Sequence, residues 1–193
     1  MKLNIPNRIT LIRLLLMPVI VFLYLAIFIP FNIFIAAGVF VLAASTDFID
    51  GMIARRKNMI TDLGKFLDPL VDKLLNISVI ILLVVDSVMP SPYGAIFAII
   101  IISRELIIGG VRAVAASKNI VIAADVWGKI KTIVQTIAIV ALMIVMGLCA
   151  QGLPSNILIY FEIVAYSLAG AAVLLTLISG INYIIKNKRV FEE

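Results

Sequence analysis

Four aspartates in two short stretches of the sequence have the spacing of a metal site. Asp47 and Asp50 are three residues apart, and Asp68 and Asp72 are four apart. Each pair therefore lies on one face of a helix, and the short connection between the two helices makes them antiparallel neighbours. Four clustered carboxylates repel one another unless cations lie between them. The pattern predicts two divalent ions, which can clamp the attacking and leaving oxygens of a phosphoryl transfer.

The composition narrows the choice of metal. The chain contains no histidine and a single cysteine, Cys149, so an internal disulfide is impossible. Any metal must be held mainly by oxygen ligands, which favours Mg²⁺ or Mn²⁺ over Zn²⁺.

Small residues beside the aspartates would let a flat ligand approach the helix backbone. Gly51 and Ala54 follow Asp50 and remove side-chain bulk, and Gly64 does the same at the start of the next helix. Arg55 is placed to contact phosphate. These residues suit a nucleotide.

The elements that must position these residues are membrane helices. The chain has 193 residues, 63% of them apolar, and a mean hydropathy of +1.19, whereas soluble domains are nearer half apolar. Six apolar segments are each long enough to cross a hydrocarbon core of about 30 Å. They cover residues 9–29, 32–55, 66–85, 93–116, 127–149 and 157–185. We expect an all-α protein with six transmembrane helices, forming one domain over residues 1–193, with residues 1–8 at the membrane interface.

The basic residues predict an orientation. The net charge is +5, and the connections near residue 30, at 86–92 and at 150–156 contain no lysine or arginine. All sixteen basic residues lie on the other side or within spans, which is a positive-inside pattern. Both termini and the aspartate site should therefore face the cytoplasm.

The aspartates also belong to a longer motif, D-x-x-D-G-x-x-A-R, eight residues, then G-x-x-x-D-x-x-x-D. The chain matches all eight fixed positions and the gap: Asp47, Asp50, Gly51, Ala54, Arg55, Gly64, Asp68 and Asp72. On these positions it resembles the CDP-alcohol phosphotransferase family. The resemblance implies a six-helix membrane fold, usually a homodimer, that releases CMP from a CDP-activated lipid.

The same resemblance implies a role for each residue of the motif. Asp47, Asp50 and Asp68 would be metal ligands, and Asp72 would complete the metal site and act as the general base. The residues implied to hold the cytidine diphosphate are Asp47, Gly51, Ala54, Arg55 and Gly64.

Other stretches of the chain bear on the acceptor. Residues 4–10, 66–75, 102–105 and 128–132 are similar to the bacterial phosphatidylglycerophosphate synthases of this family. The similarity implies CDP-diacylglycerol as donor, glycerol 3-phosphate as acceptor and the bacterial inner membrane as location. Membrane lipids are then the expected surroundings, and no nucleic-acid partner is expected.

Glycerol 3-phosphate is a dianion, and its binding site needs fixed cations. Arg104 and Arg112 are eight residues apart, about two helical turns, and point to broadly similar sides of one helix. Lys129 and Lys131 open the next apolar segment. We interpret these four as ligands of the acceptor phosphate, with Glu105 as an available partner for an arginine. The alternative for the two lysines is an anchoring role at the membrane surface.

Two other functions remain open from the residues alone. The acceptor could be phosphatidylglycerol, giving cardiolipin, or serine or inositol phosphate, with the same aspartates in use. A divalent-cation channel or transporter would belong to a different class. Its acidic residues would be spread along a pore, whereas here they gather at one face.

Overall fold

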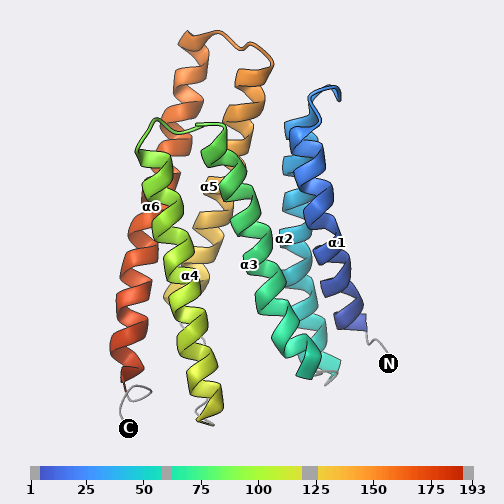
Figure 1. Ribbon diagram of the computed structural model, residues 1–193, viewed down its shortest axis with the longest axis vertical. Coiled ribbons are helices and arrows are strands. Elements are labelled where there is room, and N and C mark those ends of the chain that lie inside the picture. Colours follow the sequence, from blue (N-terminus) through green and yellow to red (C-terminus); the bar gives the residue numbers. More distant parts are fainter. Residues whose placement is uncertain (1–4, 58–61, 119–125, 189–193) are drawn as a thin grey trace.

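The computed structural model contains six α-helices in the residues it describes, which are 5–57, 62–118 and 126–188 (Figure 1). Side chains are described for residues 10–46, 70–118 and 126–188. The helices are α1 (Ile5–Leu25), α2 (Asn32–Lys57), α3 (Asp62–Val85), α4 (Tyr93–Ser117), α5 (Val126–Ala150) and α6 (Ser155–Lys186). No strand occurs in these ranges, so the all-α prediction is confirmed.

The helices extend beyond the predicted apolar segments at one end of the molecule. α1 begins at Ile5, so residues 5–8 of the expected interfacial segment belong to the first helix. α3 begins at Asp62, before the apolar run that starts at Phe66. The physical reason is that a helix does not stop where its hydrophobicity stops, because its backbone hydrogen bonds continue through polar residues.

The first helix starts and the last helix ends on the same side of the bundle. The start of α1 and the end of α6 lie at one end, and the α1–α2, α3–α4 and α5–α6 connections lie at the other (Figure 1). α1 and α2 pack side by side, α3 contacts α1 and α4, and α5 packs along α6. The first turns of α3 and α5 therefore lie at the end where α1 starts and α6 ends.

Hydrogen bonds hold the connecting segments in place at the opposite end of the bundle. The buried Asn32 side chain donates a hydrogen bond to the Tyr24 carbonyl at 2.8 Å, which ties the start of α2 to the end of α1. The Tyr166 hydroxyl donates to the Val88 carbonyl at 2.7 Å and fixes α6 to the α3–α4 connection. Gly152 has a φ of +71°, which a glycine adopts without strain and which turns the chain from α5 into α6.

Three of the helices are long and apolar enough to cross a membrane, counting only the described residues. They are α4, α5 and α6. α1 and α2 contain shorter apolar stretches, Thr10–Leu25 and Asn32–Thr46. The interior of the bundle is filled by aliphatic and aromatic side chains such as Phe40, Ile80 and Ile139, while many large apolar side chains face outward, as lipid contact requires.

A close approach of α2 to α5 depends on a glycine. Gly147 of α5 is buried, and a Cβ placed there would lie 2.8 Å from the tip of the Phe34 ring of α2. Small residues at such positions let membrane helices pack closely. Gly170 of α6 is a natural comparison, because a Cβ there would meet nothing within 4 Å.

We predict that Gly147→Ala destabilises the protein by about 1–3 kcal/mol, because the added methyl group displaces the Phe34 ring. Gly170→Ala should leave the thermal midpoint of the detergent-solubilised protein unchanged or slightly raised. Combining Gly147→Ala with Phe34→Leu should recover part of the loss. An equal effect of the two alanine substitutions would contradict this account of the α2–α5 contact.

Candidate functional site

The two aspartate stretches lie on the helices that the spacing predicted. The Asp47–Asp50 pair is near the end of α2, and Asp68 and Asp72 are in the first turns of α3. Several side chains of the motif lie outside the described residues: Asp47, Asp50, Gly51, Ala54, Arg55, Gly64 and Asp68. The shared metal site and the CDP cradle therefore stay predictions.

Asp72 is the member of the motif whose side chain the structure describes. It is half-buried on α3, and the Asn76 side chain donates a hydrogen bond to its backbone carbonyl at 2.9 Å. The Asp72 carboxylate also acts electrostatically on Lys131 of α5. The candidate general base thus lies close to a group of cations.

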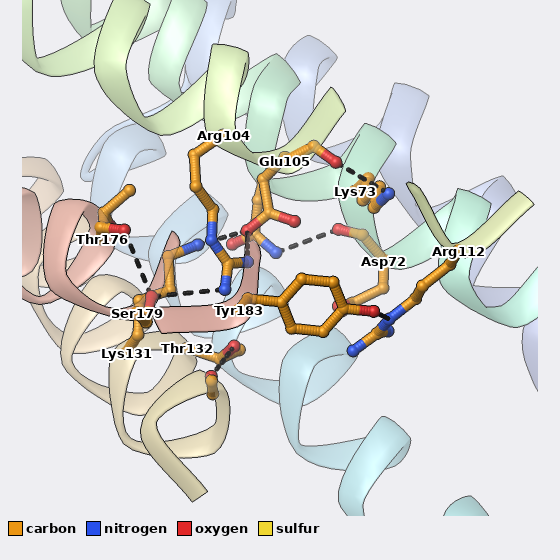
Figure 2. Close-up of polar contacts among 12 residues, drawn as sticks. Asp72, Lys73, Arg104, Glu105, Arg112, Lys131, Thr132, Thr176, Ser179 and Tyr183 are labelled. Atoms are coloured by element: carbon orange, nitrogen blue, oxygen red, sulfur yellow. Dashed lines mark hydrogen bonds and ion pairs between the residues drawn. The ribbon is translucent and has the colours of Figure 1, made fainter. Parts of the chain in front are cut away.

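That group of cations is organised around Glu105 of α4 (Figure 2). The Glu105 carboxylate accepts a hydrogen bond from the fully buried Lys131 ammonium group in a partly buried ion pair. Arg104 Nη1 lies 3.7 Å from the same carboxylate oxygen. Lys73 of α3 donates to the Glu105 backbone carbonyl at 3.0 Å, and it fits there because Gly109 has no side chain to collide with the Lys73 ammonium group. Three helices therefore bring three cations to one acidic residue.

Arg104 lies across two glycines of the neighbouring helices. A Cβ at Gly180 of α6 would lie 3.3 Å from Arg104 Cγ, and a Cβ at Gly128 of α5 would lie 4.0 Å from Arg104 Nη2. The guanidinium donates to the Ser179 hydroxyl at 3.3 Å. Its Nε is buried and has no hydrogen-bond partner among the described residues. Because a guanidinium carries five N–H donors, Arg104 keeps capacity to bind an anion.

Arg112 is placed two turns further along α4 and also reaches α6. Its Nε donates to the Tyr183 hydroxyl at 3.2 Å, and its guanidinium lies 5.6 Å from the centre of that ring. A cation over an aromatic face is an attractive arrangement. The expectation that Arg104 and Arg112 point to similar sides is met, since Ser179 and Tyr183 are four residues apart on one face of α6.

The structure separates the two lysines that the sequence grouped together. Lys131 is fully buried, with none of its surface exposed, whereas Lys129 is exposed near the start of α5. Residues two apart on a helix point in nearly opposite directions, so only one of them can face the bundle. Lys131 belongs to the cluster around Glu105, and Lys129 lies outside it.

Several residues of the site were not assigned a role from the sequence. Ser179 and Tyr183 hold the two arginines, and the missing side chain of Gly180 leaves room for Arg104. Outside this group, Arg13 of α1 is only 2% exposed, as is Thr10 one turn earlier. A charged residue in an apolar segment is costly, so the sequence alone could have marked Arg13 as a candidate.

The possible metal ligands in the sequence are mainly carboxylate oxygens, which suit a hard divalent cation. Within the described ranges, no three histidine, cysteine, aspartate or glutamate side chains form a group that could hold a metal. The one cysteine, Cys149, is exposed near the end of α5. The sequence offers the four aspartates of α2 and α3 as the residues that would hold Mg²⁺ or Mn²⁺ through oxygen ligands.

Comparison with known proteins gives a consistent result along the chain. The model of the CDP-alcohol phosphatidyltransferase family matches residues 3–179. A protein from Bacillus subtilis strain 168, named CDP-diacylglycerol–glycerol-3-phosphate 3-phosphatidyltransferase, is 39% identical, and the match covers 95% of each chain. Proteins of the same name from Rickettsia bellii and Haemophilus influenzae are 34% and 35% identical. These two matches cover 97% and 95% of this chain, and 97% and 93% of the respective relative.

The Glu105–Lys131 ion pair leads to a prediction about the free energy of unfolding. Lys131→Met should destabilise the protein by roughly 2–4 kcal/mol, because it leaves the mostly buried Glu105 carboxylate with only the more distant Arg104 as a partner. The double variant Glu105→Gln with Lys131→Met should regain much of this loss, since it removes both charges. The measurement is the thermal midpoint of the purified protein in detergent.

Lys129→Met is the matched control on the same helix, because Lys129 is exposed. It should shift the midpoint far less than Lys131→Met. Additive effects of Glu105→Gln and Lys131→Met would show that the two side chains are not energetically coupled, contrary to this prediction.

Proposed function

The chain belongs to the CDP-alcohol phosphatidyltransferase family, and from this premise we propose that it transfers the phosphatidyl group of CDP-diacylglycerol to glycerol 3-phosphate. The products are CMP and phosphatidylglycerophosphate. The observation that carries the choice of acceptor is the shared name of the relatives, which are 34–39% identical over nearly the whole chain. The complete eight-position motif supports the choice of donor.

We assign the acceptor phosphate to the basic residues of α4 and α5. Arg104 is the principal ligand, because it is held between Glu105 and Ser179 and still has unused donors. Lys131 neutralises Glu105, so the carboxylate does not repel an incoming dianion. Arg112 and the exposed Lys129 lie nearer the end of the bundle and attract the acceptor as it arrives.

Asp72 accepts the proton of the terminal hydroxyl of the acceptor. The freed oxygen attacks the phosphorus atom that carries the diacylglycerol, and the bond from that phosphorus to the CMP oxygen breaks. Asp47, Gly51, Ala54, Arg55 and Gly64 hold the cytidine diphosphate in this proposal.

Two divalent cations, Mg²⁺ or Mn²⁺, would neutralise the donor diphosphate when they are bound by the four motif aspartates, Asp47, Asp50, Asp68 and Asp72.

We extend the proposal to the arrangement in the membrane. Six spans would place both termini and the active site at the cytoplasmic face of the bacterial inner membrane. In support, α1 starts and α6 ends at the same end of the bundle as the first turns of α3 (Figure 1). The connections at the opposite end carry no lysine or arginine. We also propose that the protein forms a homodimer, as the family resemblance implies.

Purified protein should release CMP from CDP-diacylglycerol when glycerol 3-phosphate and Mg²⁺ or Mn²⁺ are present. A chelator should abolish the release, and added metal should restore it. Phosphatidylglycerol, serine and inositol phosphate should each give little release in the same assay. Strong turnover with one of these and none with glycerol 3-phosphate would assign the chain another acceptor.

Asp72→Asn should lower the rate of CMP release at least about a hundredfold, because the amide cannot accept the proton of the acceptor hydroxyl. Asp86→Asn is the control, since Asp86 is an exposed aspartate that directly follows α3 at the far end of the bundle. It should retain nearly full activity. Near-normal turnover by Asp72→Asn would remove Asp72 from the role of general base.

A further inference from the structure

A layer of buried polar side chains lies one helical turn beyond the cluster around Glu105, which we call the charged cluster, toward the middle of the bundle. Gln135 follows Lys131 by one turn on α5, and Thr176 precedes Gly180 by one turn on α6. Asn76 follows Asp72 by one turn on α3. Their exposed fractions are 3% for Gln135, 0% for Thr176 and 9% for Asn76. We call these three side chains the polar layer.

Each member of the polar layer has an oxygen atom with unused hydrogen-bonding capacity. The Asn76 Oδ1, Gln135 Oε1 and Thr176 Oγ1 atoms are buried and have no partner among the residues that the structure describes. A buried polar atom without a partner costs about 1–3 kcal/mol, and such atoms are rare in native proteins. Three such atoms lie on α3, α5 and α6, and α5 packs against both of the other helices, so together they indicate a ligand that supplies partners.

The residues next to the polar layer are apolar, so packing does not explain why these three positions are polar. One further turn along the same helix faces, the residues are apolar and fully buried, including Val79 on α3, Ile139 on α5 and Ala172 on α6. Aliphatic side chains would therefore also fit the packing in this part of the bundle. Packing alone does not require an amide or a hydroxyl group at these three positions.

The chemistry of the oxygens restricts the ligand. Amide carbonyl oxygens accept hydrogen bonds and cannot donate them, so the ligand must bring a donor. A phosphate or carboxylate group fails this requirement, and its place is at the Arg104 guanidinium. A hydroxyl group meets the requirement for one of the two amide oxygens, because it has a single proton to donate, and it can also accept a hydrogen bond from Thr176.

We propose that the polar layer binds the hydroxyl group of glycerol 3-phosphate that does not react, the one on its central carbon. This inference rests on the function proposed above. The central hydroxyl branches from the chain between the phosphate and the terminal hydroxyl, so it can point toward side chains one helical turn, about 5.4 Å, further in. With the phosphate at Arg104 and the terminal hydroxyl at Asp72, the central hydroxyl lies over the polar layer. An acceptor without that hydroxyl leaves one amide oxygen and the Thr176 hydroxyl without these partners and is bound more weakly.

The test compares glycerol 3-phosphate with 3-hydroxypropyl phosphate, which lacks only the central hydroxyl. Wild-type protein should show a KM about tenfold higher for the analogue, the effect of one or two lost hydrogen bonds. In Gln135→Met and in Thr176→Val, the KM for glycerol 3-phosphate should rise severalfold while the KM for the analogue stays nearly constant. The ratio of the two KM values should therefore fall toward one, and the KM for CDP-diacylglycerol should not change.

Thr136→Val is the matched control for Thr176→Val. Thr136 lies on α5 beside Gln135, but its hydroxyl group donates to the Thr132 carbonyl of its own helix at 3.0 Å. It should keep the wild-type ratio of KM values. Equal losses with both acceptors in both polar-layer variants would assign these residues a purely structural role and overturn the proposal.

The wild-type measurement separates this inference from the proposed function. Release of CMP with glycerol 3-phosphate, but without any preference over 3-hydroxypropyl phosphate, would overturn the polar-layer proposal alone. Absence of release with glycerol 3-phosphate, accompanied by release with another acceptor, would overturn the proposed function.

Discussion

A carboxylate inside an apolar helix bundle needs neutralising, and the Glu105–Lys131 ion pair meets that constraint here. Lys131 is fully buried and Glu105 is mostly buried, so each charge is stabilised by the other. α4 packs mainly on α6 and α3, and the ion pair gives it a polar link to α5 as well. Two further cations meet at the same residue: Arg104 Nη1 lies 3.7 Å from the Glu105 carboxylate, and Lys73 donates to the Glu105 backbone carbonyl.

Glycines allow these long cationic side chains to lie inside the bundle. Gly109 leaves space for the Lys73 ammonium group, and Gly180 leaves space for Arg104. In a membrane, small residues commonly serve helix packing. At these two positions the space they leave is occupied by cationic side chains. Glycine therefore has two uses here. At Gly147 it lets α2 and α5 pack closely, and at Gly180 it leaves space for the Arg104 side chain.

Polarity changes in steps along the bundle, and the order of the steps suits the proposed reaction. The charged cluster lies toward the end where α1 starts and α6 ends, the polar layer is one turn further in, and aliphatic side chains follow. A water-soluble phosphate acceptor would approach from the charged end. A lipid donor keeps its acyl chains beside the apolar helix faces, so the reacting groups of both substrates would meet where the polarity changes.

The sequence by itself determined the all-α fold, the six helices and the motif that marks the family, because hydrophobic runs and fixed spacings are local properties of the chain. It also indicated that Arg104 and Arg112 share one face, since helical periodicity relates residues within one element. Only the tertiary structure decided that Lys131 is buried while Lys129 is exposed, and that Glu105 joins Lys131 and Arg104. The partners that fix these side chains, such as Ser179 and Tyr183, lie more than seventy residues away in the chain. Which residues meet across helices depends on how the helices pack and rotate against one another, and no spacing within a single helix contains that information.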